Sequence, residues 1–307
     1  MMPAPGVDGL RPYQPEDLDR VLRFVGECCA QTDFCGGLHP GDIGHAISNT
    51  LRGRDVDKHL YLCEDGQGKV IALLLIHPAR SAGFELVVDP AYRSSDLETE
   101  WLAVGSRLAF GVADNIGTEV MNCEVTRRDA LLSLGFTADE APSMMFTMRS
   151  LDVLIPEVVL PEGFTIRSVA GEQEAALLGE VHSGAFGSNW PPGEYLNVMR
   201  SPAFEIEREL VVVAPDGRFA AFLVYWIDPV SQAGLFEPVG CHPDFQRRGL
   251  TKALMYEGMR RMTARGMKTA AVLHHTDNLA STALYRSVGF EPKYMITTYR
   301  KHKALSA

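Results

Sequence analysis

The sequence predicts an α/β (α+β) protein of two tandem domains, each with a mixed, mostly antiparallel sheet flanked by helices. The chain has 307 residues, which is about twice the length of an average domain. Apolar runs joined by Asp-Gly turns alternate with segments that predict helices. Landmarks of the first half recur in the second half in the same order, which indicates an internal repeat.

The repeat rests on three pairs of landmarks, separated by 151, 153 and 154 residues. They are the Asp-Gly turns at 65–66 and 216–217, the prolines Pro90 and Pro243, and the phenylalanines of two Gly-Phe pairs, Phe136 and Phe290. Three landmarks in one order at almost one separation indicate two copies of one unit. We therefore predict domains at 1–155 and 156–307, with the seam at an extended stretch that Pro156 and Pro161 bracket.

Each copy begins with a short strand, at 9–13 or 164–168, that leads into a helix opened by acidic residues, as helix N-termini favour. A loop and a second helix follow. Asp-Gly between two apolar runs then predicts a hairpin. A further strand, a helix, a strand and a last helix that ends at Gly-Phe complete the copy. Hairpins combined with helical crossovers imply a mixed sheet covered by helices.

Composition and charge exclude several classes of protein. Hydrophobic residues make up 46% and charged residues 22%, an ordinary globular balance. The net charge of −10 argues against nucleic acid as the main partner and weakly favours cationic acceptors. The longest aliphatic run, Val70–Ile76, is far shorter than the roughly 20 residues of a membrane helix. The first residues show no basic segment followed by an apolar one, so the expected location is the cytoplasm.

Six cysteines are few for a chain of this length, and the expected state is reduced thiols packed as small hydrophobic side chains. Five residues of metal-ligating type fall within one short stretch: Cys28, Cys29, Cys35, His39 and His45. Zinc sites usually pair cysteines about two to four residues apart, and this spacing differs. No metal site is predicted.

The segment 235–256 predicts a strand, a turn and a helix, and the turn carries the first chemical motif. Its residues are Gln246, Arg247, Arg248, Gly249, Leu250 and Thr251. Unpaired N–H groups at a helix start favour an anion, and Gly249 lets the backbone approach a bulky phosphate. Two arginines add positive charge. These features predict a pyrophosphate cradle, and the alternative is a basic helix start without function.

A second motif follows the apolar strand predicted at 269–273. Asn278 is placed to cap the next helix, and Tyr285 lies seven residues later, two helical turns along the same face. Taken alone, this tyrosine is better explained as a core residue whose hydroxyl is bonded nearby.

Together the two motifs resemble the GNAT superfamily of acyl-CoA N-acyltransferases. Its first hallmark, Gln or Arg followed by x-x-Gly-x and then Gly or Ala, reads Gln-Arg-Arg-Gly-Leu-Thr at 246–251. Its later hallmark reads Asn278, Tyr285, Gly289 and Phe290. The chain departs from the pattern at Thr251, where Gly or Ala is usual, and at Ser281, where Ala is usual.

The resemblance implies that the second half binds acetyl-CoA as its cosubstrate. The pyrophosphate would lie on 246–251, and the pantetheine would pair with the strand backbone at Val239 and Cys241. Asn278 belongs to the same cofactor-binding set. Tyr285 would be the general acid that protonates the departing CoA thiolate. A covalent role for the Cys241 thiol is the less favoured alternative.

For the general base the sequence offers Glu237, on the strand that leads to the cofactor turn, where relatives often carry a glutamate. Side chains alternate along a strand, so Glu237, Val239 and Cys241 share one face unless a bulge intervenes. The alternative for Glu237 is an exposed residue at a strand end. A histidine titrates nearer neutral pH than a carboxylate. The rival bases, at the end of the next strand, are His274, His275 and Asp277.

The first half carries a different turn. Aligned on the shared proline, 93–98 (Arg-Ser-Ser-Asp-Leu-Glu) falls on the Gln-Arg-Arg-Gly turn. Asp96 replaces the glycine and Glu98 adds a second negative charge, and these carboxylates would repel a pyrophosphate by about several kcal/mol. A leucine (Leu131 or Leu132) stands where the tyrosine would be. The first domain is therefore predicted to be a degenerate copy that keeps the fold without the reaction.

The predicted function is an acetyl-CoA-dependent N-acetyltransferase that acetylates a primary amine of a small molecule or peptide by direct attack in a ternary complex. One alternative is a mycothiol synthase-like enzyme, also a tandem protein with its active half at the C-terminus. An alternative from another class is a non-catalytic acyl-CoA-binding or sensing protein, which needs no acid at Tyr285. The loop 185–199 is expected to line the acceptor site, where Trp190 and Tyr195 either stack on a substrate or pack locally.

Overall fold

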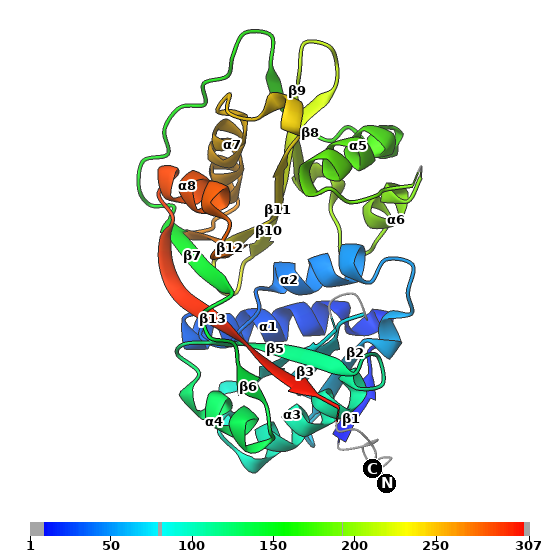
Figure 1. The fold of residues 1–307 in the computed structure, drawn as a ribbon. Coiled ribbons are helices and arrows are strands. Elements are labelled where there is room, and N and C mark those ends of the chain that lie inside the picture. Colours follow the sequence, from blue (N-terminus) through cyan, green and yellow to red (C-terminus); the bar gives the residue numbers. More distant parts are fainter. Residues whose placement is uncertain (1–8, 79–81, 192, 304–307) are drawn as a thin grey trace.

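A computed structural model describes residues 9–78, 82–191 and 193–303. The two halves of the chain form two lobes, and the final strand runs from the C-terminal lobe into the N-terminal one (Figure 1). Both lobes contain predominantly antiparallel sheets with helices on their faces, which confirms the predicted fold class. Within these residues no helix is long and apolar enough to cross a bilayer. The expectation about a targeting segment rests partly on residues 1–8, which lie outside the described part.

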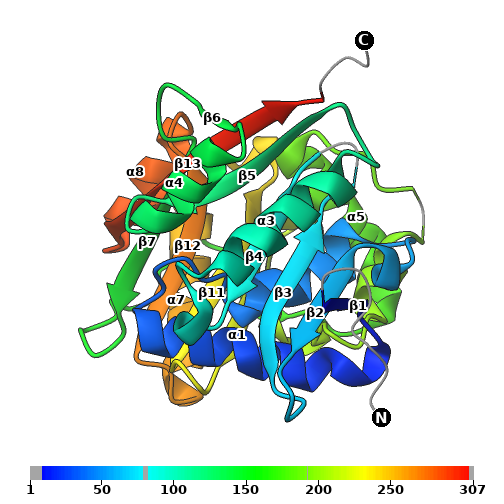
Figure 2. The same ribbon diagram turned by 90° about the horizontal axis from the view of Figure 1, so that it is seen from below.

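The N-terminal lobe is built on a four-stranded antiparallel sheet in the order β1-β2-β3-β4. Its strands are β1 (Leu10–Pro12), β2 (Leu60–Glu64), β3 (Val70–Ile76) and β4 (Phe84–Val88). Successive β3 side chains enter different cores: Leu73 and Leu75 pack with α1 (Leu18–Thr32), and Leu74 packs with α3 (Asp96–Ala109). The two helices therefore cover opposite faces of this sheet (Figure 2).

The remaining elements form one long sheet and its helices. From the first half come α2 (Pro40–His45), β5 (Asn115–Met121), α4 (Val125–Ser133), β6 (Thr137–Ala138) and β7 (Met144–Ser150). From the second half come β8 (Thr165–Ser168), α5 (Ala175–Phe186), α6 (Tyr195–Met199), β9 (Glu209–Val213), β10 (Phe219–Asp228), β11 (Ala233–Cys241), α7 (Leu250–Ala264), β12 (Thr269–His275), α8 (Leu279–Ser287) and β13 (Glu291–His302). Single-turn helices lie at 15–17, 46–50, 56–58, 90–92, 172–174, 206–208 and 243–245.

The internal repeat is visible in the packing of the two lobes. Phe84 and Phe136 meet edge to face with ring centres 6.2 Å apart, and Phe236 and Phe290 repeat this contact at 6.3 Å. Each Gly-Phe landmark therefore anchors its last helix against the strand that follows the hairpin. The predicted hairpins are present as β2–β3 and β9–β10.

The sequence predicts that each copy ends at the Gly-Phe helix, but in the structure one more strand follows in each copy. These strands, β7 and β13, join the two halves. β7, from the first half, pairs with β12, and β13, from the second half, pairs with both β7 and β5. The sheet order is β5-β13-β7-β12-β11-β10-β9-β8, with β6 on β13 (Figure 1). The boundary predicted between 155 and 156 thus follows a strand that lies in the sheet of the second half.

Two cysteines are not in the expected state. Cys35 and Cys123, 88 residues apart in the sequence, form a disulfide, whereas Cys28, Cys29 and Cys63 are buried free thiols. The expectation of reduced thiols is therefore wrong for this pair. The loop after α1 brings Cys35 beside the end of β5, and the spacing of cysteines along the chain gives no sign of that contact.

Candidate active site

A cleft of about 540 Å³ opens in the C-terminal lobe beside β11, α7 and α8. It forms where two parallel strands diverge, because β11 and β12 pair only over Ala233–Leu235 and Thr269–Ala271. The residues of this cleft include nine of those predicted to bind acetyl-CoA or to catalyse: Val239, Cys241, Gln246, Arg247, Gly249, Leu250, Thr251, Asn278 and Tyr285. The two sequence motifs therefore meet in one place.

The turn into α7 has the geometry of an anion cradle. Gly249 is the N-cap residue, with a left-handed φ of +75°, and a Cβ added to it would meet nothing within 4 Å. Arg247 is also left-handed, with φ +63°. The first N–H groups of an α-helix have no helical acceptor, so those of α7 are free to bind an anion. The open space over Gly249 lets such an anion approach the backbone.

Arg248 points away from this cleft. Its guanidinium donates to the Asp244 carbonyl at 3.2 Å and lies 5.5 Å from the centre of the Phe245 ring. It lines a separate surface hollow together with Arg218. The turn therefore presents Arg247 to the cleft and Arg248 to its outer side.

Helix α8 positions the second motif. Asn278 caps it, as predicted, by accepting the Ser281 N–H at 3.0 Å. Tyr285 is only 6% exposed and lines the cleft. Burial, and secondly the negative charge of Glu237, raises the pKa of Tyr285. A hydroxyl that keeps its proton at neutral pH is suited to act as a general acid.

The rival bases lie behind or outside this arrangement. His274 is buried edge-on against Tyr285, with ring centres 5.0 Å apart. Burial, with His275 as second cause, lowers the pKa of His274. His275 and Asp277 are exposed at the end of β12. None of the three lines the cleft, and Glu237 is not among its lining residues either.

A bulge in β11 decides where Glu237 points. The register with β10 shifts between Phe236 and Val239, which interrupts the alternation of side chains. Val239 and Cys241 pack toward the core that contains α7, whereas a Glu237 carboxylate oxygen lies 3.8 Å from the His45 ring on α2. The bulge is the exception that the sequence argument allowed for, and it turns Glu237 toward the other lobe.

Glu237 has the electrostatics of a general base. One third of its side chain is exposed, and the surrounding protein raises its pKa to about 7 by desolvation. Its backbone carbonyl accepts the Trp226 indole N–H at 2.7 Å, which fixes the strand at this point. A carboxylate with a pKa near neutrality can take a proton from an amine and release it again at the same pH.

Comparison with known proteins agrees with this geometry. Residues 177–290 match the Acetyltransferase (GNAT) family. The mycothiol acetyltransferase of Streptomyces bingchenggensis is 30% identical over 298 residues, which cover 92% of this chain and 92% of that protein. The chain is a GNAT acetyltransferase. The mycothiol acetyltransferase of Streptomyces coelicolor is 28% identical over 299 residues, with 92% and 91% covered.

Two solved structures are similar to this chain over nearly its whole length, and one of them is a tandem GNAT protein. A tandem GNAT protein from the clavulanic acid biosynthesis pathway has a TM-score of 0.70 at 13% identity and covers 97% of this chain and 99% of its own. A GCN5-related N-acetyltransferase from Sphaerobacter thermophilus has a TM-score of 0.65 at 18% identity and covers 95% of both chains. At these identities the likeness concerns the fold, and it confirms two GNAT units in one chain.

The N-terminal GNAT unit has a related turn before α3, and a side chain of the chain itself fills it. Ser94 is left-handed with φ +62°, like Arg247 in the other unit. The Ser94 N–H donates to one carboxylate oxygen of Glu98 at 2.6 Å, and Arg127 donates to the other at 2.8 Å. Glu98 is 3% exposed. A carboxylate of the chain itself therefore occupies the anion-binding turn.

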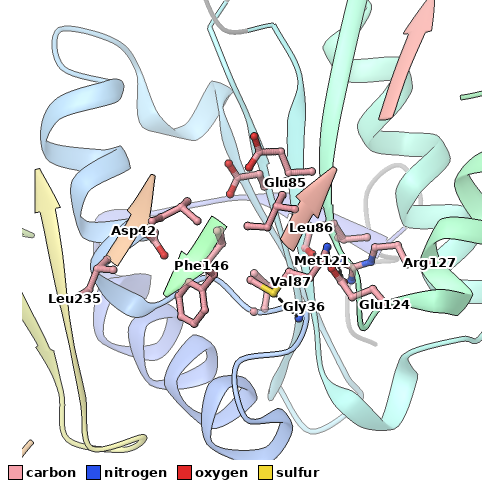
Figure 3. A pocket seen from close by; sticks show the side chains of 15 residues that line it. Gly36, Asp42, Glu85, Leu86, Val87, Met121, Glu124, Arg127, Phe146 and Leu235 are labelled. Carbon is pink, nitrogen blue, oxygen red and sulfur yellow. Dashed lines mark hydrogen bonds and ion pairs between the residues drawn. The ribbon is translucent and has the colours of Figure 1, made fainter. Parts of the chain in front are cut away.

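A second, smaller cavity of about 60 Å³ lies between the two GNAT units (Figure 3). Asp42 and Leu235 lie on one side of it, and Met121 and Arg127 lie on the other. Its carboxylates are Asp42, Glu85, Glu119 and Glu124. Burial raises the pKa of Glu119 to about 7, and burial together with the nearby Glu237 raises the pKa of Asp42 well above its usual range. The acidic cavity thus extends to the neighbourhood of the candidate base.

Three residues that the sequence left open have packing roles. Tyr195 is 2% exposed, and its hydroxyl donates to Glu209 at 2.6 Å. The Arg52 guanidinium carbon lies over the Trp190 ring, 4.1 Å from the ring centre. Burial raises the pKa of the Cys241 thiol, which disfavours the thiolate that a covalent mechanism needs.

Sequence reasoning missed what the first half contributes to this site. Asp42 and His45 reach the neighbourhood of Glu237 from α2, and His45 was considered only as a metal ligand. The one local sign is the pair Gly41 and Gly44, three residues apart in a helix, a spacing that permits another element to pack closely on that face.

Proposed function

We propose that this GNAT protein transfers an acetyl group from acetyl-CoA to a primary amine of a small molecule, with the reaction in its C-terminal lobe. The observation that carries the proposal is the cleft. The two sequence motifs meet there, beside the edge of β11 that diverges from β12, and the buried Tyr285 lines it. The backbone at Val239 and Cys241 suits pantetheine, and the open turn at Gly249 suits a pyrophosphate. Acetyl-CoA would supply the activated acetyl group.

Glu237 and Tyr285 handle the two protons of the reaction. Glu237 takes a proton from the acceptor ammonium, which leaves a neutral amine whose lone pair attacks the acetyl carbonyl carbon. As the bond from that carbon to sulfur breaks, Tyr285 gives its phenolic proton to the departing thiolate. The nitrogen of the adduct gives up its second proton, which restores the Tyr285 phenol and leaves a neutral amide. A positioned acid or base typically contributes about 10² to 10⁴ in rate.

The acceptor is proposed to be a polar small molecule. The relatives of highest identity above are mycothiol acetyltransferases, so the deacetylated form of mycothiol is the first acceptor to try. The cavity between the units supports a polar acceptor, because the carboxylates of Asp42, Glu85 and Glu119 can accept hydrogen bonds from hydroxyl or ammonium groups. Its volume of about 60 Å³ accommodates a small polar group.

The test is acetyl-CoA turnover with a panel of amines: deacetylated mycothiol, amino sugars, polyamines and short peptides. Chromatography follows the formation of CoA, and mass spectrometry locates the added acetyl group on the amine nitrogen. We expect saturable turnover with at least one small-molecule amine. A protein that binds acetyl-CoA in calorimetry and forms no CoA with any amine would instead be an acyl-CoA-binding protein.

A further inference from the structure

Helix α2 of the N-terminal unit is seated tightly on the sheet of the C-terminal unit. A Cβ added to Gly41 would lie 2.5 Å from Trp226, and one added to Gly44 would lie 2.6 Å from the same ring. At the start of the helix, His39 accepts the Gly41 N–H on Nδ1 and therefore donates from Nε2 to the Ala233 carbonyl at 3.1 Å. These contacts fix α2 against β10 and β11, the strands that hold Glu237.

The last residue of this helix faces the candidate base. His45 Nε2 lies 3.8 Å from Glu237 Oε1, and the side chains are 21% and 33% exposed. This separation is less than about 1 Å longer than the usual donor–acceptor distance of a hydrogen bond. Catalytic hydrogen bonds in structures without substrate are often long and tighten when the substrate binds. A small rotation of either side chain would bring the two groups into contact.

The surroundings keep His45 neutral. Burial, together with repulsion from His182 and Arg52, lowers the pKa of His45 to about 4. On the carboxylate side, Asp42 and Tyr285 are the titratable groups that interact with Glu237. A neutral imidazole offers an N–H donor without a positive charge, and a positive charge here would repel the ammonium of an acceptor. A neutral His45 beside Glu237 therefore allows the carboxylate to bind the positively charged ammonium of the acceptor.

The N-terminal unit pairs the equivalent glutamate with a histidine of its own. Phe84-Glu85 corresponds to Phe236-Glu237 in the repeat, and His77 Nε2 lies 2.7 Å from Glu85 Oε1. The C-terminal unit takes its histidine from the other half of the chain. Each unit therefore has a histidine beside this glutamate, hydrogen-bonded in the N-terminal unit and 3.8 Å away in the C-terminal unit.

We propose that His45 is a positioning residue of the C-terminal active site, which donates its Nε2–H to the Glu237 carboxylate and aims it at the acceptor amine. The N-terminal unit, whose own turn before α3 is filled by Glu98, thereby completes the site of its neighbour. This inference rests on the proposed function, because it concerns the base of that reaction.

The test compares His45→Ala and His45→Gln over a pH series, with the amine that the wild type acetylates. Loss of a donor to a carboxylate should lower kcat about tenfold. It should also move the acidic limb of kcat/KM to higher pH, because the ionised form of Glu237 loses a hydrogen bond. The glutamine, whose amide N–H replaces Nε2–H, should restore most of kcat and return the limb. Affinity for CoA should stay unchanged in both variants.

His59→Ala is the matched control, since His59 lies in the same lobe and its ring contacts the Ile76 carbonyl at 2.9 Å. It should retain the wild-type profile. The inference fails if His45→Ala leaves kcat and the acidic limb unchanged, or if His45→Gln is as impaired as the alanine variant. If the wild type acetylates no amine, the proposed function fails. If the wild type is active and the His45→Ala variant has the same kinetics, only the inference about His45 fails.

Discussion

The turns that open α3 and α7 share one left-handed residue, but they differ in their contents and in where the helix starts, at Asp96 in the first and at Leu250 in the second. Both place a left-handed residue at the corresponding position, Ser94 in the first and Arg247 in the second. In the second turn, Gly249 leaves open space where a phosphate can approach. In the first turn, the carboxylate of Glu98 accepts the Ser94 N–H and is held by Arg127. An anion-binding turn has thus become an internal ion-pair site.

The difference shows how a duplicated unit can lose a ligand and keep its fold. The free N–H groups at a helix start need an acceptor, and either a bound anion or a carboxylate of the chain satisfies them. Arg127 is buried and also pairs with Glu124 at 2.8 Å, so the charge of Glu98 is matched inside the lobe. In the N-terminal unit the Ser94 N–H already has an acceptor in Glu98, and α2 of that unit packs on the sheet of its neighbour.

Removing the acid should have the largest effect, since Tyr285 is the feature that most clearly separates the active unit from the one that carries Leu131. Tyr285→Phe should lower kcat by about 10² to 10⁴ and leave the affinity for CoA nearly unchanged. Steady-state kinetics and calorimetry measure the two quantities. Tyr294→Phe is the control, because its hydroxyl donates to the Asp33 carbonyl away from the cleft. A kcat equal to wild type, with chemistry rate-limiting, would remove the role.

Substitution of Glu237 should change the pH profile of kcat/KM, whereas substitution of the corresponding Glu85 should change KM for the acceptor. Because the pKa of Glu237 is about 7, kcat/KM should rise as pH increases through 7, where the base becomes ionised. Glu237→Gln should abolish that limb and lower the rate by about 10² or more. Glu85→Gln should keep the limb and raise KM for the acceptor, since Glu85 lines the acidic cavity. Matching profiles for the two variants would contradict this division.

Stability gives Glu237 an independent readout. Folding raises its pKa, so between the unfolded and folded values the native state binds the extra proton, and this group's contribution to stability falls as pH rises through 7. Glu237→Gln removes the penalty of the buried charge. Thermal unfolding should therefore show the variant gaining on the wild type as pH rises from about 4.5 to about 7, with a constant difference at higher pH. A constant difference across pH would indicate that the carboxylate titrates normally.

A carboxylate placed in the turn before α7, as Glu98 is in the turn before α3, should strongly weaken CoA binding. Thr251 is the counterpart of Glu98, so Thr251→Glu places a carboxylate where it can reach the Arg247 N–H. Competition and charge repulsion should raise the Kd for CoA about 100-fold, by the Coulomb scale at close range. The matched neutral variant, Thr251→Gln, should raise it only a few-fold. Calorimetry decides, and equal losses in both variants would show that size, not charge, is responsible.

Local patterns predicted the parts of this molecule that local physics determines. The Asp-Gly hairpins, the Asn278 cap and the helix ends at Gly-Phe depend on residues close in sequence, and the structure has them all. The exchange of β7 and β13 depends on which lobe each strand reaches, and nothing near those strands in sequence encodes it. The same holds for the Cys35–Cys123 bridge and for the approach of His45 to Glu237.

The turn before α3 shows most clearly that contacts between distant segments could not be predicted from the sequence. The sequence indicated that Asp96 and Glu98 would repel a phosphate, but it did not indicate that Glu98 fills the turn itself. That arrangement needs Arg127, which arrives on α4 and pairs with Glu98 across 29 residues. Likewise, two adjacent arginines in the active turn look equivalent in sequence, and only the backbone direction sends Arg248 outward.

The smallest effects are expected from the arginines that the alignment places in or beside the two turns. Arg248→Ala should weaken CoA binding by about threefold or less, because its guanidinium lies outside the cleft and acts only through screened long-range charge. Arg93→Ala should leave CoA binding unchanged, at one CoA per chain. It should instead lower the free energy of unfolding by about 1–3 kcal/mol, since its guanidinium donates to the carbonyls of Val88, Cys35 and Gly36, and removing it leaves these acceptors without that donor.

Calorimetry with CoA and denaturant unfolding of both variants separate these outcomes. Salt sharpens the comparison, because the small loss in Arg248→Ala should disappear at high ionic strength, whereas the stability loss in Arg93→Ala, which comes from partly buried hydrogen bonds, should remain. A large and salt-independent loss of CoA affinity in Arg248→Ala would mean that this side chain swings into the cleft when the ligand binds. The outward direction of Arg248 would then belong to the ligand-free state alone.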